Sequence, residues 1–430
     1  MSAVPSGWKV ERLKDVARVN ANALPAGTDA DYEFDYLEIS NVNYNGVVST
    51  DAIEHLRFED APSRARRRVA SGSTVISSVR PNLQAVAFFA SAPKHLICST
   101  GFNVVEPQSN KLAPQFTYYH LLSENARQYF EAAATGVGYP AIGDKDFNAF
   151  TVTLPPLPEQ QRIATYLAAS CAAIDAAVSA KRRQLDTLEA LRKSIIQRAV
   201  TFGIEANPKL RQVNSDWIRE VPSHWDVCRV KRVVARMDYG IGVSTGDEGR
   251  YPVLKMGNVQ DGEIQFAKLD FIDEVDDNLI LERGDLLYNR TNSPDQVGKA
   301  AIFRKSRADA ITFASYLVRL RVNHRVNAWY LNYVLNSSGF LAFARRLAVP
   351  SVQQSNLNST RYAQMFIPLP PIEEQKAILS FLNEKTAAVD TVVATIQTQI
   401  ETLTAYRKSL IHECVTGQRR VTEADVAAIA

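Results

Sequence analysis

Four polar loops hold the residue types in this chain that are best suited to reading a ligand. They lie at residues 80–84 and 136–145 in the first half, and at 289–296 and 350–358 in the second half. An arginine fork can donate two hydrogen bonds to a guanine edge, and an asparagine or glutamine can form two with adenine. The candidate DNA-contacting residues are Arg80, Asn82, Gln84, Tyr139, Lys145, Arg290, Asn292, Ser293, Gln296, Gln353, Gln354 and Asn356.

The same side chains have a simpler explanation. Asn, Ser and related residues in loops often satisfy turn geometry or are solvated. For any single residue we favour that explanation. For each half of the chain as a whole, we expect at least one of its two loops to touch a ligand.

No catalytic motif accompanies these loops. The chain has no GxxxxGK[ST] phosphate loop and no strand–GxGxxG–helix unit. The triplet Glu374-Gln375-Lys376 resembles half of a nuclease motif, but no acidic partner is suitably placed, and the sequence has Glu159-Gln160-Gln161 at the corresponding place. The histidines and cysteines show no metal-ligand spacing. We therefore predict a non-catalytic chain with no metal and no cofactor of its own.

The elements that must position the loops occur twice. Residues 154–160 read Leu-Pro-Pro-Leu-Pro-Glu-Gln, and residues 369–375 read Leu-Pro-Pro-Ile-Glu-Glu-Gln. With the same offset, Arg192-Lys193-Ser194-Ile195-Ile196 falls on Arg407-Lys408-Ser409-Leu410-Ile411. One uninterrupted offset over so long a segment establishes an internal duplication.

Each copy predicts a long helix that follows a proline-rich start. After Pro158 there is no Pro or Gly until Gly203, and good helix formers dominate. Apolar residues recur every three or four positions, as in a coiled coil. The members of this stripe are Ile163, Leu167, Ile174, Val178, Leu185, Leu188, Ile195 and Ala199, then Ile378, Leu382, Val389, Val392, Ile396, Ile400, Leu403, Leu410 and Cys414. Ser170, Lys181 and Arg192 interrupt it.

Such a helix would extend roughly 60 Å at 1.5 Å per residue, so its apolar stripe needs a partner. We expect the two copies to pair within the chain, antiparallel, as a pseudo-two-fold axis between the halves would require. The alternative is a scaffold helix that packs onto its own domain or onto a sister chain.

The resulting fold class is α+β, with two pseudo-two-fold-related globular domains separated by two long antiparallel coiled-coil helices. The predicted boundaries are residues 1–153 for the first domain, 154–205 for the first helix, 206–368 for the second domain, 369–420 for the second helix and 421–430 for a tail. Predicted strands cover 74–79, 85–89, 102–105, 285–288, 300–303 and 316–320, and predicted helices cover about 116–134 and 328–347.

Composition limits the class of protein. A hydrophobic content of 46% and a charged content of 22% over 430 residues suit a soluble protein of two domains. The formal net charge of +3 means that any nucleic-acid surface is local. The four cysteines are scattered, no apolar run approaches 18 residues, and the N-terminus is not a signal peptide. A cytoplasmic protein with no membrane contact is expected.

One local basic cluster lies at Arg64 to Arg68. It could hold phosphates, and a solvated surface face is an equally open explanation. The second half has no equivalent cluster and is acidic from Asp270 to Asp277.

The doubled Leu-Pro-Pro-Leu/Ile-x-Glu-Gln start followed by a long helix resembles the specificity subunit of Type I restriction–modification systems. The resemblance covers nearly the whole chain. Residues 284–290 with 297–302, and 79–83 with 99–102, are similar to the target-recognition domains of that family, although these strand motifs are less specific than the helix starts.

The resemblance implies that each domain reads one half of an asymmetric bipartite site in double-stranded DNA, while the helices set the spacing. It implies docking of two methyltransferase (modification) subunits and of ATP-dependent restriction subunits. S-adenosylmethionine, ATP and Mg are then expected on those partners. A different class of function is left open, namely a coiled-coil scaffold whose duplicated domains bind proteins and do not read DNA.

Overall fold

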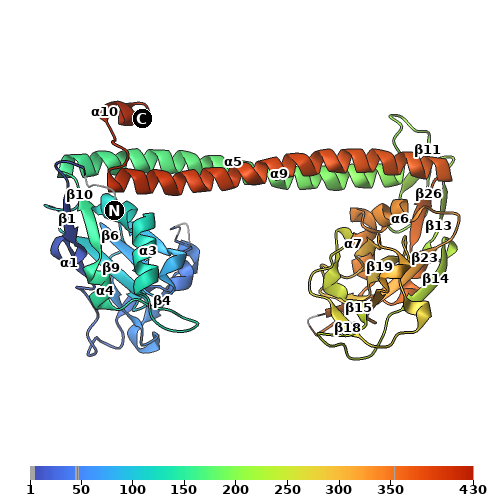
Figure 1. Ribbon diagram of the computed structural model, residues 1–430, viewed down its shortest axis with the longest axis horizontal. Coiled ribbons are helices and arrows are strands. Elements are labelled where there is room, and N and C mark those ends of the chain that lie inside the picture. The colour runs from blue at the N-terminus through green and yellow to red at the C-terminus, as the bar shows by residue number, and fades with distance from the viewer. Residues whose placement is uncertain (1–4, 44–45, 47, 353, 430) are drawn as a thin grey trace. The chain divides into compact units, whose positions relative to one another are not determined.

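The computed structural model describes residues 5–43, 46, 48–352 and 354–429, and it divides into two compact units. Unit 1 comprises residues 1–182 with 397–430, and unit 2 comprises residues 183–396. Each unit contains one α+β domain together with part of both long helices, which Figure 1 labels α5 and α9.

Two four-stranded sheets form the centre of unit 1. Their orders are β2-β9-β6-β7 and β4-β3-β8-β5. The strands are β2 (Ala17–Val19), β3 (Glu33–Leu37), β4 (Glu54–Arg57), β5 (Ala65–Arg68), β6 (Ser73–Ser77), β7 (Val86–Phe89), β8 (Leu96–Ser99) and β9 (Phe102–Pro107). A separate pair joins β1 (Lys9–Arg12) to β10 (Thr151–Leu154). The helices are α1 (Leu13–Val16), α2 (Pro114–Leu121), α3 (Glu124–Ala133), α4 (Asp144–Ala149) and α10 (Glu423–Ala427).

Unit 2 is built on a six-stranded sheet of order β14-β23-β19-β21-β17-β16. Its strands are β14 (Val234–Tyr239), β16 (Val259–Gln260), β17 (Gly262–Ile264), β19 (Leu286–Asn289), β21 (Ala300–Ile302) and β23 (Leu317–Val322). Smaller sheets contain β11 (Leu210–Gln212), β12 (Glu220–Pro222), β13 (Asp226–Arg229), β15 (Tyr251–Leu254), β18 (Asp270–Ile272), β20 (Thr291–Asn292), β22 (Thr312–Phe313), β24 (Val349–Ser351), β25 (Gln354–Asn356) and β26 (Phe366–Leu369). The helices are α6 (Ala328–Leu335), α7 (Ser338–Leu347) and α8 (Ser359–Gln364).

The six strands expected from the sequence are confirmed as β6, β7, β9, β19, β21 and β23. The expected helices at 116–134 and 328–347 are each two helices instead of one, with a break at Ser123 and at Ser337. Both serine hydroxyls donate to a carbonyl three residues back, at 2.7 Å. A serine that bonds its own backbone in this way competes with helical continuation.

The two long helices are α5 (Leu157–Phe202) and α9 (Ile372–Thr416). Within unit 1 their contacts run in opposite chain directions, because Asp175 pairs with Arg407 at 3.0 Å and Lys181 with Gln399 at 2.6 Å. In unit 2, Arg192 lies 3.7 Å from Asp390. The expected antiparallel pairing is confirmed inside each unit. Two of the polar interruptions in the stripe, Lys181 and Arg192, contact polar partners on the facing helix.

Most of the apolar stripe is buried where the helices pack. One member was placed wrongly, since Val392 is 46% exposed. The buried positions nearby are Val389 and Ile396, with Val393 half-buried between them. A spacing of four, then three, keeps these three side chains on one face, and Val392 falls outside it.

Among the described residues, one helix has an 18-residue window apolar enough to cross a membrane by length and composition alone, and that helix is α5. The expectation that no segment has this character is corrected here. Alanine raises the mean hydropathy of this window without an uninterrupted run of large apolar side chains. Leu167, Cys171, Ile174 and Val178 of this helix pack in the core of unit 1.

A buried glutamine joins each helix start to the domain beside it. The side chain of Gln160 accepts a hydrogen bond from the Ala113 amide at 2.8 Å and donates to the Lys111 and Pro155 carbonyls at 3.0 and 2.9 Å. Gln375 repeats the arrangement with Asn327, Arg325 and Pro370 at 2.7, 3.1 and 2.9 Å. This pair, the glutamine clasps, explains structurally why both copies contain glutamine at this position.

A tryptophan packs against the C-terminal end of one long helix in each unit, α5 in unit 2 and α9 in unit 1. The two tryptophans differ in whether the indole N–H has a hydrogen-bond partner. Trp225 lies beneath Gly203 and donates to the Glu374 carboxylate at 2.9 Å. Trp8 lies beneath Gly417, and its indole N–H has no partner in the described part of the chain. Both glycines have a positive φ, which ends the helix where a larger residue would meet the ring.

Unit 2 contains a buried charge network, whereas no Asp, Glu, Lys or Arg is buried among the described residues of unit 1. Arg319 is fully buried and donates to Asp238 at 2.6 Å and to the Asn278 and Ile280 carbonyls. Burial alone would raise the pKa of Asp238, but hydrogen bonds from Arg319 and Arg236 outweigh it and lower that pKa. In the sheet of unit 2, Arg319 of β23 lies opposite Leu287 of β19. The corresponding pair in unit 1 is apolar, because Val104 of β9 lies opposite Val75 of β6.

His120 gives unit 1 a predicted acid sensitivity. Its ring is buried, its Nε2 accepts a hydrogen bond from the Thr153 amide at 3.1 Å, and burial lowers its pKa to about 4. The unfolded chain binds this proton below about pH 6.5, while the folded chain does not until about pH 4. We expect the stability of unit 1 to fall by about 3 kcal/mol as the pH drops from 6.5 to 4.

This expectation can be measured by urea unfolding at pH 7 and pH 4.5. His120→Gln should flatten the dependence, while His95→Gln, at an exposed histidine, should leave it unchanged. An equal slope in all three proteins would show that His120 is not the titrating group.

Candidate nucleic-acid interface

Backbone contacts bring together the two predicted loops of unit 1. Val79 forms an antiparallel bridge with Ala141. The Ile142 amide donates to the Ser78 carbonyl at 2.9 Å, and the Arg80 amide donates to the Pro140 carbonyl at 2.7 Å. The loops at 80–84 and 136–145 therefore form one tip, called tip 1 here, although they are more than fifty residues apart in the sequence.

Tip 1 presents some of the predicted side chains to solvent. Arg80 and Asn82 are exposed, and the Arg80 guanidinium lies 4.4 Å from the centre of the Tyr139 ring, which is 72% exposed. Lys145 is exposed in the first turn of α4. Gln84 differs, because it is half-buried and donates to the Leu122 carbonyl at 3.1 Å.

Unit 2 builds its tip, tip 2, in the same way. Strand β20 pairs with β25, with Thr291 opposite Asn356 and Asn292 opposite Ser355. The Leu357 amide donates to the Arg290 carbonyl at 2.8 Å. This bond corresponds to that between Ile142 and Ser78, so Arg290 occupies the backbone position of Ser78 and not that of Arg80.

Several predicted residues of tip 2 satisfy turn geometry. The Asn292 side chain accepts from the Ser293 amide at 2.8 Å. Ser293 and Gln296 both donate to the Asp295 carboxylate, at 2.7 and 2.5 Å, and these bonds lower the pKa of Asp295. Asn356 donates to the Thr291 hydroxyl at 3.0 Å. In this structure these groups hold the loop in shape.

Arg290 is half-buried at the base of tip 2. Its guanidinium lies 5.1 Å from the centre of the Tyr239 ring and donates to the Ser315 carbonyl at 3.2 Å. Its Nε is buried without a partner in the described part of the chain. Gln354 is half-buried on β25, and Gln353 lies outside the described residues.

Four exposed apolar or aromatic residues at or beside the tips were not predicted from the sequence. Val137 is fully exposed and Val352 is 90% exposed. Tyr239 and Tyr316 are 44% and 47% exposed. The Arg290 guanidinium lies over the Tyr239 ring, and the Arg290 amide donates to the Tyr316 carbonyl. The position of the two valines between glycines or polar residues was an available signal. The tyrosines lie outside the four loops in sequence, so only the fold places them there.

The basic cluster Arg64 to Arg68 is largely engaged within unit 1. Arg64 pairs with Glu38 at 3.3 Å, and Arg67 bonds the Phe102 carbonyl and Asn103. Burial lowers the pKa of Arg67. Arg66 lies over the Phe58 ring. The cluster is therefore a strand face that is partly buried and partly solvated. Arg68 is exposed and is the member of the cluster that lines a cleft.

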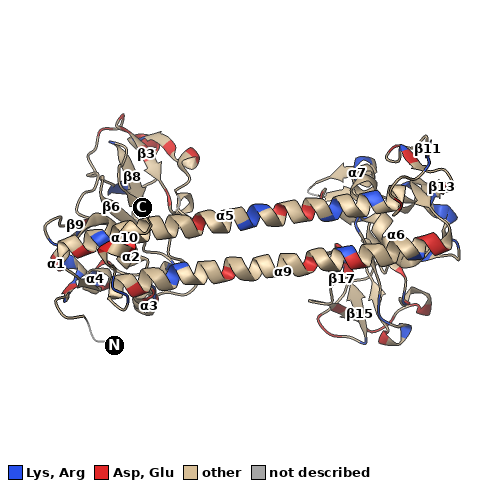
Figure 2. Ribbon diagram, turned by 90° about the horizontal axis from the view of Figure 1, so that it is seen from above, with Lys and Arg blue, Asp and Glu red and all other residues tan. Residues whose placement is uncertain are grey.

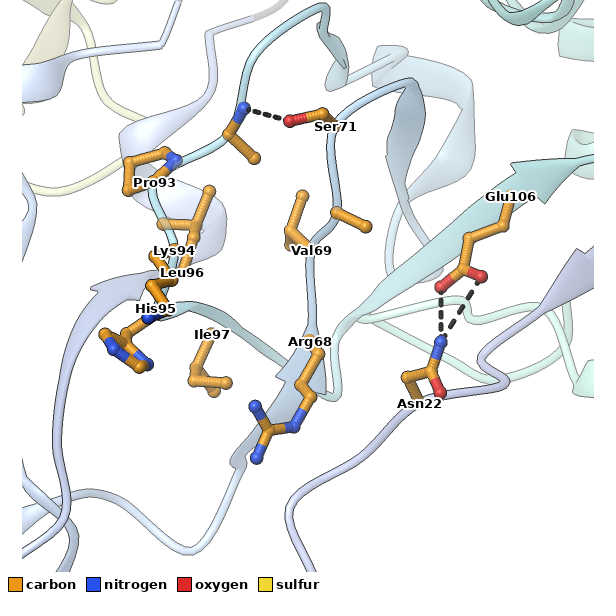
Figure 3. Close-up of a pocket in the computed structure, with 12 residues that line it drawn as sticks. Asn22, Arg68, Val69, Ser71, Pro93, Lys94, His95, Leu96, Ile97 and Glu106 are labelled. Atoms are coloured by element: carbon orange, nitrogen blue, oxygen red, sulfur yellow. Dashed lines mark hydrogen bonds between the residues drawn. The ribbon is translucent and has the colours of Figure 1, made fainter.

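That cleft has a volume of about 270 Å³ and is drawn in Figure 3. Arg68, Lys94 and His95 line it together with apolar residues of β8 and the adjacent loop. Glu106 is held by Asn22 at 2.9 Å and by Arg18 at 3.5 Å. None of the predicted DNA-contacting residues lines it. The interface candidates are therefore the two tips.

Charge and metal chemistry give no competing site on the helices. Figure 2 shows basic and acidic residues interspersed along α5 and α9. Within the described ranges, no group of three or more His, Cys, Asp or Glu residues is arranged to hold a metal ion.

Comparison with known proteins gives an independent result. The model of the Type I restriction modification DNA specificity domain matches residues 5–184 and again residues 226–402. The two matches cover most of the chain and correspond to its two copies.

Relatives with curated names match at low identity. The Type I restriction enzyme MjaVIII specificity subunit of Methanocaldococcus jannaschii is 24% identical over 73% of this chain and 72% of its own length. The EcoKI specificity subunit of Escherichia coli is 21% identical over 76% and 71%. The putative MjaX specificity subunit is 28% identical, but that match spans about half of each chain, 46% and 47%.

Two solved structures share the fold. One aligns with a TM-score of 0.78 at 21% identity. It is described as the structural basis underlying complex assembly and conformational transition of the type I R-M system. It covers 97% of this chain and all of that chain. The HsdS subunit of Thermoanaerobacter tengcongensis aligns with a TM-score of 0.54 at 21% identity, covering 97% and 98%.

Proposed function

The chain belongs to the family of Type I restriction modification DNA specificity domains, and from this we propose that it is the DNA specificity subunit of a Type I restriction–modification complex. Each unit reads one half of an asymmetric bipartite site in double-stranded DNA. The paired helices set the distance between the halves. The chain itself is non-catalytic and serves an adenine-methyltransferase and ATP-dependent endonuclease complex.

One observation supports this function above the others. The chain contains the same framework twice, and the two frameworks carry different tips. Arg290 of tip 2 occupies the backbone position of Ser78 and not that of Arg80, and the second loop contributes Tyr139 at tip 1 but Gln354 and Asn356 at tip 2. A reader of two unlike sequences needs this combination, because base edges are distinguished by hydrogen-bonding side chains and not by the framework.

The partners follow from the proposed role. Two methyltransferase subunits dock on the paired helices, and restriction subunits join that core. S-adenosylmethionine, ATP and Mg are held by those subunits. The weak net charge of this chain favours modest DNA affinity by itself, with the partners adding phosphate contacts. A cytoplasmic location follows from the DNA substrate.

An exchange of one domain tests the function. Residues 206–368 are replaced with the second domain of a relative whose target is known, and the chain is produced with its methyltransferase subunits. We expect sequencing of methylated host DNA to show a new sequence in one half-site and the original sequence in the other. The reciprocal exchange of residues 1–153 is the matched control and should change the opposite half.

An unchanged target after both exchanges would overturn the proposal and leave the protein-binding scaffold as the function. Loss of all methylation from a chain that still forms the complex would also count against independent half-site reading.

A further inference from the structure

The backbone of tip 1 is fixed in a shape that non-glycine residues seldom adopt. Arg80 and Gln84 have φ values of +48° and +51°, and they flank the short 3₁₀ turn Pro81–Leu83. Such left-handed residues carry strain and persist where surrounding contacts hold them. Here the Arg80 amide is held by Pro140 and the Gln84 side chain by Leu122. The position of the Arg80 Cα is thus set before any ligand arrives.

The Arg80 side chain is also held in place, but most of its hydrogen-bond donors remain available. Its guanidinium lies 4.4 Å from the centre of the Tyr139 ring, and Nη2 donates to the Gly138 carbonyl at 3.0 Å. A guanidinium has five N–H donors. Among the residues that the structure describes, the Gly138 carbonyl is the one acceptor of the Arg80 guanidinium, and no carboxylate pairs with it. Both side chains are exposed, so the ring orients a planar donor group whose remaining edge faces solvent.

A guanidinium presented in this way matches one base better than the others. Guanine offers two acceptors, O6 and N7, side by side in the major groove, and an arginine fork can bond both. Stacking on an aromatic ring orients the fork before binding, so less freedom is lost on contact. A phosphate could also accept two bonds from the fork, but a phosphate contact would not depend on the base at one position, and the test below separates the two ligands on that ground.

Tip 2 provides a contrast within the same chain. Arg290 also lies over a tyrosine, Tyr239, and also donates to one carbonyl, that of Ser315, but unlike Arg80 it is half-buried. The ring comes from β14 and not from the second loop. The arrangement with an exposed, oriented fork is therefore specific to tip 1.

We propose that Arg80 reads a guanine in the half-site of unit 1, and that Tyr139 is the positioning residue that holds its guanidinium plane. This inference rests on the proposed function and adds the identity of one base and the residue that recognises it.

The test uses the chain assembled with its methyltransferase subunits. Methylation rates are measured on duplexes in which each base pair of both half-sites is changed in turn. Arg80→Ala should reduce the preference for guanine at a single position by roughly 5- to 150-fold and leave every other position unchanged. Arg80→Lys should lose most of that preference, because an ammonium lacks the planar fork.

The tyrosine variants separate positioning from packing. Tyr139→Phe retains the ring and should behave like the wild type. Tyr139→Ala should weaken discrimination at the same position by about two- to five-fold. Arg12→Ala, which removes an exposed arginine from β1, is the matched control and should leave discrimination unchanged. Because Arg80 and Tyr139 are both exposed, thermal unfolding should be similar for all variants.

Each contrary outcome has a distinct meaning. A uniform loss for Arg80→Ala across all positions would identify a phosphate contact and overturn the guanine assignment. Unchanged discrimination would overturn it as well. An effect of Arg80→Ala without any effect of Tyr139→Ala would remove the positioning role. If the wild-type complex shows no sequence preference on any duplex, the proposed function itself fails.

Discussion

Replacing Gln160 with alanine is expected to destabilise unit 1 by about 3 kcal/mol or more. The substitution leaves the Ala113 amide and the Lys111 and Pro155 carbonyls without the partner that now satisfies all three. Each unsatisfied buried polar group costs about 1–3 kcal/mol. Gln375→Ala should have the same effect on unit 2, where Gln375 is likewise fully buried.

The measurement must resolve the two units, so hydrogen exchange in increasing urea suits it. The amides of α2 should lose protection first in Gln160→Ala, and those of α6 in Gln375→Ala. Gln161→Ala is the matched control, since it removes the neighbouring, exposed glutamine from the same turn. If Gln160→Ala and Gln161→Ala were equally stable, the glutamine clasp would not contribute to the stability of unit 1.

The second large effect is expected at Arg319. Arg319→Leu should destabilise unit 2 by about 3–5 kcal/mol, because it removes one member of a buried charge network. Asp238 and Asp285 would lose a cation that lies 2.6 and 3.8 Å away. The carbonyls of Asn278 and Ile280 would lose their donor. Unit 1 should be unaffected.

Two further variants test the cause. Arg304→Ala removes an exposed ion pair with Glu263 and should cost no more than about 1 kcal/mol. The double variant Arg319→Leu with Asp238→Leu should regain part of the lost stability, because it removes a largely buried carboxylate that keeps only Arg236, at 2.9 Å, as its cationic partner. Asp285 keeps Arg321 at 2.8 Å in that variant. A double variant less stable than Arg319→Leu alone would contradict this explanation.

Much of the fold could be predicted from the sequence because the chain is duplicated. Two copies of the helix segment, related by a single offset, predicted both helix starts, and short apolar runs in each half predicted the six central strands. The same pattern predicted that Lys181 and Arg192 interrupt the stripe, although not that they pair across the helices. Local signals sufficed here because helix formers, prolines and strand periodicity act over short distances.

The candidate site was less accessible to sequence reasoning. The four loops were found, but nothing in the sequence aligned Arg290 with Ser78 instead of Arg80, because hydrogen bonds to a distant segment define that register. Tyr239 is brought to Arg290 by sheet topology alone. The inward direction of Gln84 and the internal bonds of Ser293 and Gln296 also depend on neighbours far along the chain.

The backbone hydrogen bonds that connect the two loops of each tip affect how the sequence of such a chain can evolve. Main-chain atoms make the ties at Ser78 with Ile142 and at Arg290 with Leu357, so they are available to nearly any amino acid. Substitutions in either tip can accumulate while the remainder of the molecule stays intact. A lineage can thus acquire a new target sequence through substitutions confined to one tip.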